Sequence, residues 1–354
     1  MTGPNEHISV PFFFVVGRAR SGTTLLRCLL DAHPEINIPL ECAFIIHLYS
    51  KYGKTTLWNE QKILSFYHDL NQYPKFHFWT IDKDKLKNDL LQCAGTNSYS
   101  QICKVVYMNF KSFFPKKEIK LLGDKNPSYS FHTKKLLQLF PEARFIHITR
   151  DYRDNILSII HAKFETKIFS SLAYRWKYSN KQVLKQKKRT PDRFFTLRYE
   201  DLVAQPELYL RQICDFIGIG FDPGMIDYHA KLDEMRKIYP EDLINRHHKS
   251  LFQPINTDKI YAWKKLLTEK QVRICDTVVG PFAEKMGYER KYKRRFFMYL
   301  YCLPGMLYGR ALYFFMGIIH KLPLKIRMKI VNGLAIIFKH DWKMFQKSET
   351  VTNK

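Results

Sequence analysis

The stretch FFFVVGRARSGTTLL, residues 12–26, decides the fold of this chain. Its first five residues are all apolar, which predicts a buried strand over 12–16, and a helical pattern follows over 23–31. Between the two, Gly17 and Gly22 have the Gly-x4-Gly spacing of a phosphate-binding loop. A strand that turns through such a loop into a helix directs backbone amides and the positive helix end at one point. We therefore expect an anion site here.

The loop differs from that of a nucleoside triphosphatase in where its cations lie. A triphosphatase loop continues with Gly-Lys-Ser/Thr, whereas this one continues with Gly22-Thr23-Thr24. Its cations are Arg18 and Arg20, inside the loop. An arginine offers a bidentate, permanently charged contact to a compact oxyanion. The pattern thus favours an anion with less charge than a triphosphate, bound without a metal ion.

Further strands alternate with helices along the chain. Residues 143–149 and 194–198 are apolar enough for buried strands, the first followed by a helical pattern to about residue 163. Residues 206–216 read as a helix that ends near Gly218. This order predicts an α/β fold with a mostly parallel central sheet that is flanked by helices.

Two other regions are predicted to be helical. Residues 268–271 (TEKQ) form a capping box, which predicts a helix from there to Gly287 with a kink at Pro281. Residues 51–118 are rich in aromatic residues and lysine and lack a clear period, so we interpret them as helices and loops inserted beside the sheet on the acceptor side.

Composition limits the class of protein. The chain has 354 residues, is 45% hydrophobic and carries a formal net charge of +25, which indicates a globular protein with an anionic partner: a nucleic acid, a membrane surface or an anionic substrate. The seven cysteines form no CxxC pair, which favours a reducing compartment. The N-terminal MTGPNEHISV lacks the pattern of a signal peptide. We expect a cytoplasmic protein, either free or peripheral at the inner face of the membrane.

The C-terminal part differs from the rest, and we treat 291–354 as a basic, aromatic helical extension of a domain over 1–290. The apolar run 296–319 is long enough to cross a bilayer, but Pro304 and Arg310 interrupt it. Basic residues flank the run on both sides. Two interpretations stay open: a segment at the membrane interface, or helices packed on the domain core.

The residues quoted so far carry a resemblance. Residues 14–41 resemble the 5′-phosphosulfate loop of sulfotransferases that use 3′-phosphoadenosine 5′-phosphosulfate (PAPS), in the style of the tyrosylprotein and bacterial branch. Arg150 at a strand end, with Ser158 eight residues later, resembles the 3′-phosphate motif of that family. The resemblance covers about residues 12–290 and implies a P-loop-like sulfotransferase fold. Further similar pieces are GDKNP (123–127), RYEDL (198–202) and the pattern of Trp263, Leu267, Gly287 and Tyr288.

The resemblance also implies roles for individual residues. Lys125 would stabilise the bridging oxygen as its bond to sulfur breaks, and Arg150 with Ser158 would hold the 3′-phosphate. Tyr199 and Ser250 match nucleotide contacts of the tyrosylprotein branch, although Gln253 stands where that branch has a lysine. The implied contacts of the 5′-phosphosulfate are Arg18, Arg20, Ser21, Gly22, Thr23 and Thr24.

The acceptor hydroxyl needs a general base. Glu41 follows the loop helix and His33-Pro34, as the base does in the tyrosylprotein branch, and burial would raise its basicity. Cytosolic small-molecule sulfotransferases use a histidine, so His33 and His47 remain alternatives.

The sequence thus favours a PAPS-dependent sulfotransferase that releases 3′,5′-bisphosphoadenosine (PAP), needs no metal and acts on a lipophilic alcohol such as a lipid, a sterol or a lipid-linked glycan. A tyrosyl peptide or a carbohydrate is the alternative acceptor. A nucleoside-phosphate kinase is disfavoured by the missing loop lysine. A non-catalytic membrane- or nucleic-acid-binding module would fit the charge, but no nucleic-acid-reading motif accompanies it, so we expect no nucleic acid partner.

Overall fold

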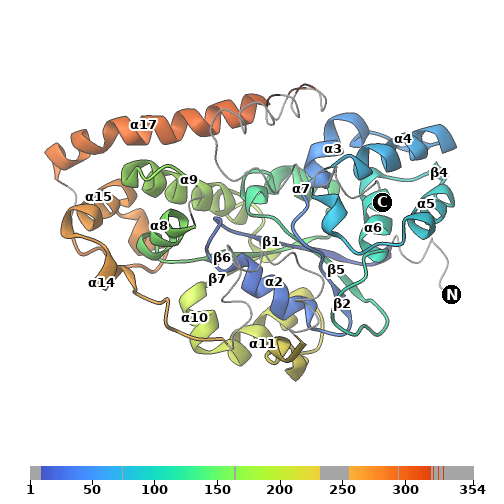
Figure 1. Ribbon diagram of the computed structural model, residues 1–354, viewed down its shortest axis with the longest axis horizontal. Coiled ribbons are helices and arrows are strands. Elements are labelled where there is room, and N and C mark those ends of the chain that lie inside the picture. The colour runs from blue at the N-terminus through green and yellow to red at the C-terminus, as the bar shows by residue number, and fades with distance from the viewer. Residues whose placement is uncertain are drawn as a thin grey trace, which may run out of the picture.

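Five parallel strands form the central sheet of the computed structural model (Figure 1). The structure describes residues 9–73, 75–162, 165–231, 255–293 and 295–319, together with 322, 326 and 330. The strand order is β2-β5-β1-β6-β7, so β1 lies between β5 and β6. The strands are β1 (Phe12–Val16), β2 (Ile36–Asn37), β5 (Leu121–Lys125), β6 (Arg144–Thr149) and β7 (Phe194–Arg198).

The side chains of β1 alternate between the two faces of the sheet. Phe12, Phe14 and Val16 belong to one buried cluster, and Phe13 and Val15 belong to another. All five are at most 2% exposed, as expected for a parallel strand that is covered on both sides. The predicted strand and the predicted α/β architecture are confirmed.

Helices cover both faces (Figure 1). One face carries α2 (Thr23–Asp31), α10 (Tyr199–Ala204) and α11 (Pro206–Ile217), which pack on β1, β6 and β7. The other carries α7 (Thr133–Leu139) and α9 (Phe169–Lys187), with α8 (Tyr152–His161) and α15 (Glu269–Val279) packed against α9. Gly218 ends α11 in the left-handed region, as the sequence predicted.

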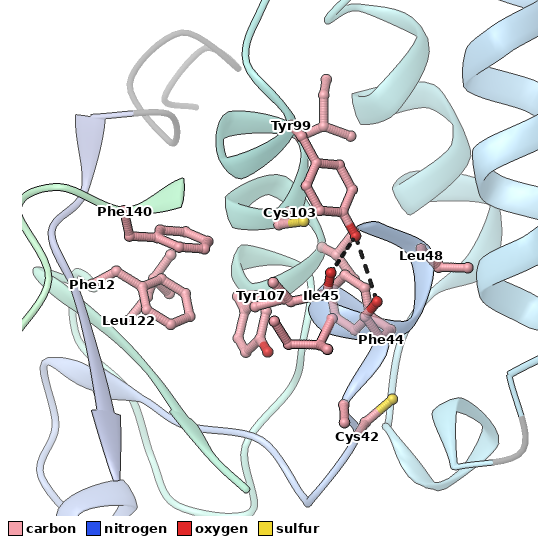
Figure 2. Close-up of a cluster of buried hydrophobic side chains, with 14 of the residues drawn as sticks. Phe12, Cys42, Phe44, Ile45, Leu48, Tyr99, Cys103, Tyr107, Leu122 and Phe140 are labelled. Carbon is pink, nitrogen blue, oxygen red and sulfur yellow. Dashed lines mark hydrogen bonds between the residues drawn. The ribbon is translucent and has the colours of Figure 1, made fainter. Parts of the chain in front are cut away.

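The region 51–118 consists mainly of helices and lies beside the sheet (Figure 1). Figure 2 shows its junction with the sheet: Tyr107 faces Phe12, with ring centroids 4.9 Å apart. The hydroxyl of Tyr99 donates to the carbonyl oxygen of Ile45 (3.0 Å) and so fixes the chain just after Glu41. The elements here are α3 (Phe44–Tyr52), β3 (Leu57–Trp58), α4 (Glu60–Asn71), η1 (Phe76–Phe78), α5 (Lys83–Leu91), β4 (Gly95–Thr96) and α6 (Tyr99–Met108).

The helix predicted to run to Gly287 is two helices. The capping box is present, since Thr268 accepts from the amide of Gln271 and Gln271 from that of Thr268. However, α15 ends before Gly280, whose φ is +60°, and Pro281 opens a new short helix rather than kinking the first. The remaining short elements are η2 (Pro127–Phe131), η3 (Pro191–Arg193), η4 (Pro223–Met225), η5 (Tyr228–Lys231), α14 (Trp263–Leu266) and α16 (Phe282–Lys285).

The apolar C-terminal run forms one helix, α17 (Phe296–Ile319), which lies along the outside of α9 and α15 (Figure 1). It continues through Pro304, and Gly305 and Gly309 let it approach Ser170 and Ser171 of α9 closely. Its other side is exposed and apolar. By length and composition α17 could cross a membrane, yet one face is packed on the domain.

Candidate active site

The predicted phosphate loop follows β1 and leads into α2, at the carboxyl end of the sheet. Here β1 lies between β5 and β6, neither of which is adjacent to it in the sequence, and ligands often bind at such a point of a parallel sheet. Both glycines are required by close packing. A Cβ on Gly17 would lie 2.3 Å from the carbonyl oxygen of Ile148, and one on Gly22 would lie 2.4 Å from Cδ2 of Tyr199. Gly22 also has φ +92°, which disfavours any other residue.

The end of the loop leaves the first turn of α2 without a side-chain cap. Ser21 is fully buried, and its hydroxyl accepts from Nδ2 of Asn155 (3.1 Å) on α8. The same amide group donates to the carbonyl oxygen of Ala19 (2.8 Å). Asn155 therefore stabilises the conformation of the loop through Ala19 and the hydroxyl of Ser21. The start of α2 is uncapped, and a helix start with unpaired backbone amides is suited to an anion.

Arg18 forms an ion pair with a residue outside the loop. Its guanidinium donates to Glu165, which also accepts from Arg175. Arg175 in turn lies under the ring of Tyr313 of α17, 4.8 Å from the ring centroid. Arg18 is 7% exposed, so this pairing compensates a buried charge. The structure thus gives Arg18 a link to α17.

Arg20 and Arg150, predicted to bind at opposite ends of one nucleotide, lie next to each other. Nη1 of Arg150 is 3.4 Å from the carbonyl oxygen of Arg20, and Nε of Arg20 donates to Ser158 (3.1 Å). Arg150 also donates to the carbonyl oxygen of Lys259 (2.7 Å) and stacks on Tyr199, 4.7 Å from the ring centroid. The structure thus brings the predicted 3′-phosphate residues together and adds Lys259 to them.

This cluster is strongly cationic. Desolvation and the charge of Arg150 lower the pKa of Arg20, and desolvation with Arg150 and Arg20 lowers the pKa of Lys259. Among the described residues no carboxylate is within ion-pair distance of Arg150 or Lys259, and Nε of Arg150 is buried without a hydrogen-bond partner. The acids that neighbour Arg150 in sequence are otherwise engaged, because Asp151 pairs with Arg153 (2.7 Å) and Asp154 accepts the amides of Tyr261 and Trp263 (2.8 Å each). Arg150 is 7% exposed, so an anion bound at this cluster would offset the cost of burying its charge.

The other motifs of the resemblance build the frame around Arg150. Glu200, from RYEDL, accepts from the amide of Asp151 (2.9 Å), and Tyr288 donates to Glu200 (3.1 Å). The indole of Trp176 donates to the carbonyl oxygen of Arg150 (3.0 Å). Arg153 lies over the ring of Trp263, 3.7 Å from its centroid. These side chains hold the turn between β6 and α8 in place.

Lys125 and Glu41 meet at the end of β5. Nζ of Lys125 lies 3.1 Å from Oε2 of Glu41 and 3.5 Å from the hydroxyl of Thr24. Lys75, from the region beside the sheet, donates to Oε1 of Glu41 at 2.7 Å. Behind Lys125, Asp124 accepts from Tyr107 (2.6 Å) and Asn126 (2.7 Å), and burial raises its pKa to about 7.

The expectation that burial raises the basicity of Glu41 is wrong. Desolvation does act in that direction, but the nearby ammonium groups of Lys75 and Lys125 outweigh it and hold the pKa of Glu41 well below its usual range. Glu41 is ionised, and its charge is shared between two cations.

The alternative bases differ in their surroundings. His33 is 3% exposed, and both ring nitrogens contact the backbone: Nε2 the carbonyl oxygen of Gly220 (2.8 Å) and Nδ1 the amide of Glu35 (3.1 Å). The ring of His47 packs at a tilt against that of Tyr73, with ring centroids 5.0 Å apart. Ser250 lies outside the described residues.

Three residues of the site were missed in the sequence: Asn155, Lys259 and Lys75. Asn155 lies between Arg150 and Ser158, in the stretch RDYRDNILS (150–158), and an asparagine there can hydrogen-bond to a neighbouring loop. Lys259 follows Gln253, which departs from the family pattern, by six residues in the chain; Gln253 lies outside the described residues. No motif in the sequence around Lys75 indicates a role in the site.

The geometry agrees with the comparisons. The family model described as "Sulfotransferase family" matches residues 11–223, and the chain belongs to this family. It is therefore a sulfotransferase by family, and the predicted class is confirmed.

Individual relatives differ in their acceptors. The chain is 26% identical over 295 residues to protein-tyrosine sulfotransferase A of Caenorhabditis elegans, covering 79% of this chain and 67% of that protein. It is 29% identical over 333 residues to the omega-hydroxy-beta-dihydromenaquinone-9 sulfotransferase Stf3 of Mycobacterium bovis, covering 80% and 76%. Among solved structures, the sulfotransferase domain of the Synechococcus PCC 7002 olefin synthase matches with a TM-score of 0.53 at 20% identity, over 79% of this chain and 95% of that domain. The last comparison supports the fold.

Proposed function

We propose that this protein transfers the sulfuryl group of PAPS to an acceptor hydroxyl. The observation that supports the proposal is the cation cluster of Arg20, Arg150 and Lys259 beside Ser158. The pair of Lys125 and Glu41 is a second cluster, formed by other segments of the chain. An adenosine with phosphate groups at its 3′ and 5′ positions would offer one anionic group to the cluster and another to the loop.

In the proposed reaction the acceptor oxygen attacks sulfur in line with the leaving oxygen. Glu41 accepts the hydroxyl proton as the new oxygen–sulfur bond forms. The bond between sulfur and the bridging oxygen breaks, its electron pair stays on that oxygen, and PAP departs. Lys125 stabilises the negative charge on the bridging oxygen, and the loop amides with Thr23 and Thr24 hold the 5′-phosphate.

The test of the donor is a thermal shift without metal. PAP should stabilise the protein, and Arg150→Ala should remove the preference for PAP over adenosine 5′-phosphate. Lys264→Ala, a change of an exposed lysine outside the cluster, is the control. Stabilisation only by ATP with Mg²⁺ would instead indicate a kinase.

Glu41→Gln tests the base. We expect transfer of ³⁵S from labelled PAPS to fall by about 10²-fold or more, because general base catalysis contributes on that scale, while PAP affinity stays within about twofold. Turnover near the wild-type rate would move the base role to another residue.

For the acceptor we propose a lipophilic alcohol, met at the membrane by residues 291–354 as an extension of the 1–290 domain. The support is the outer face of α17, where Phe297 is 82%, Phe314 65% and Phe315 60% exposed. Apolar patches of this kind are rare on monomeric soluble surfaces. Residues 289–354 contain fourteen lysine and arginine residues against three acidic ones, which suits an anionic bilayer. All seven cysteines are unpaired, in keeping with a cytoplasmic location.

Vesicle flotation tests this surface. Phe297→Asp with Phe315→Asp should weaken binding to phosphatidylglycerol vesicles, whereas Leu208→Asp on α11, also an exposed apolar residue, should not. Equal flotation of all three proteins would remove the membrane from the proposal.

A tyrosyl peptide is the second candidate acceptor, favoured by the protein-tyrosine sulfotransferases among the relatives. Transfer of ³⁵S from labelled PAPS into fractionated lipid, glycan and protein extracts separates the candidates.

A further inference from the structure

Glu41 is held by two lysines that use different oxygens. Lys75 donates to Oε1 at 2.7 Å, and Lys125 contacts Oε2 at 3.1 Å. The side chain of Lys125 is 5% exposed, and those of Glu41 and Lys75 are about one-third exposed, at 34% and 35%. The two cations therefore divide the carboxylate between them and leave neither oxygen without a charged partner.

The two lysines come from different parts of the fold. Lys125 ends β5 in the central sheet, whereas Lys75 lies between α4 and η1, within residues 51–118. The same region fixes the backbone around the carboxylate, because the indole of Trp79 donates to the carbonyl oxygen of Leu40 (2.7 Å) and Tyr99 to that of Ile45 (Figure 2). Lys75 is thus the charged group by which this region touches Glu41.

The ammonium group of Lys125 cannot keep its contact with Glu41 in full and also bind the leaving oxygen of the donor. When its ammonium turns to the bridging oxygen, Oε2 of Glu41 loses its cation and becomes able to accept a proton from the acceptor. Oε1 keeps Lys75. A carboxylate held at one oxygen retains its orientation, and catalysis by a base depends strongly on that orientation.

We propose that Lys75 is the positioning residue of the base, and that donor binding unmasks Glu41 by taking Lys125 from it. This inference rests on the proposed function. Without donor, both carboxylate oxygens are engaged by lysines, so the acceptor hydroxyl finds no free base. The site is therefore built for donor first and acceptor second, with residues 51–118 forming the acceptor side.

The titratable groups around the carboxylate of Glu41 determine its pKa. Besides Lys75 and Lys125, the neighbouring titratable groups are the buried thiol of Cys42, whose pKa burial raises, and Asp124 behind Lys125. Removing the charge of Lys75 raises the pKa of Glu41, because one of its two cations is lost. Base activity would then disappear at a higher pH on the acid side.

The experiment uses Lys75→Met and Lys75→Arg, with Lys87→Met on the exposed side of α5 as the matched control. The probe is hydrolysis of ³⁵S-labelled PAPS, in which water takes the place of the acceptor hydroxyl. Released sulfate is followed from pH 3 to pH 8, with the release without enzyme subtracted, because the pKa of Glu41 lies below its usual range. PAP affinity is measured by calorimetry on the same full-length proteins.

For Lys75→Met we expect kcat for hydrolysis to fall by roughly tenfold or more from misplacement of the base. We expect the acid limb of its pH profile to move up by about one unit or more from the lost cation. PAP affinity should stay within about twofold, since the hydrogen bond of Lys75 goes to the base Glu41. Lys75→Arg should restore the acid limb, and Lys87→Met should behave as wild type.

A pH profile of Lys75→Met that superimposes on the wild-type profile overturns the inference, and so does a PAP affinity that falls in step with kcat. These outcomes differ from failure of the proposed function, in which Glu41→Gln keeps full hydrolysis or PAP does not bind at all. If Lys75→Met fails to fold, Lys75→Gln and Lys75→Arg give the same comparison through the pH profile.

Discussion

The cationic side chains at the site differ in whether a carboxylate compensates their charge. Arg150 and Lys259 have no carboxylate within ion-pair distance among the described residues, whereas Arg18 is paired with Glu165. Arg150 is 7% exposed, and burying a cation without an anionic partner is unfavourable, so binding of an anion here is expected to stabilise the protein. The pairing with Glu165 compensates the charge of Arg18 within the protein.

Gly22 offers a test at this scale. Alanine there would place its Cβ 2.4 Å from the ring of Tyr199 at φ +92°, and an unfavourable φ alone costs about 1–3 kcal/mol. We expect Gly22→Ala to weaken PAP binding by about tenfold or more, measured by calorimetry. Gly220→Ala, where a Cβ meets nothing within 4 Å, should bind PAP normally. Equal affinities would show that the loop does not need its close approach to Tyr199.

Among the elements, α17 is unusual in being apolar on its packed and its exposed side. Its packed side depends on glycine, since a Cβ on Gly305 would lie 1.9 Å from the hydroxyl of Ser170. Its Tyr313 donates to the carbonyl oxygen of Arg175 (3.3 Å) and packs near Phe131, with ring centroids 4.7 Å apart. Arg175 and Arg18 both donate to Glu165. We therefore expect a displacement of α17 to change the position of the loop.

Gly305→Val should loosen α17 from α9. Gly317→Val is the matched control, because a Cβ there meets nothing within 4 Å although the residue lies in the same helix. Hydrogen exchange should show lower protection in α17 for Gly305→Val, with the loop at 17–22 following it. Unchanged protection in both variants would contradict the packing described for this helix.

Across the whole molecule, several carboxyl groups are buried in surroundings that favour the neutral form. Burial raises the pKa of Asp124 to about 7 and that of Asp154 to about 6. An acid whose pKa is higher in the folded state holds its proton longer there than in the unfolded state. Its contribution to the free energy of unfolding is then largest at low pH and falls as pH rises through the folded value.

Asp124→Asn tests this dependence. In the wild type, the part of stability that depends on Asp124 should decline between its ordinary pKa of 3.8 and about 7, so the variant should lose stability less steeply over that interval. Urea unfolding at a series of pH values measures the slope. Asp192→Asn, at an exposed position, should leave the slope unchanged.

Much of the core fold was predictable because its signals are local. The strands at 12–16 and 194–198 and the helix at 23–31 coincide with β1, β7 and α2. β5 was missed as a strand because its sequence LLGDK ends in two charged residues, which its place beside β1 nevertheless buries. The division of 268–287 into two helices depended on the conformation of Gly280.

The sequence by itself determined the phosphate loop, its missing lysine and the family, since these depend on residues adjacent in the chain. Only the tertiary structure decided which cations meet. Lys259 is 109 residues from Arg150, and Lys75 is 34 residues from Glu41, without any spacing that marks them. The structure also decided the protonation of Glu41, because a pKa depends on the charges that folding brings within a few ångströms, and no local pattern encodes those distances.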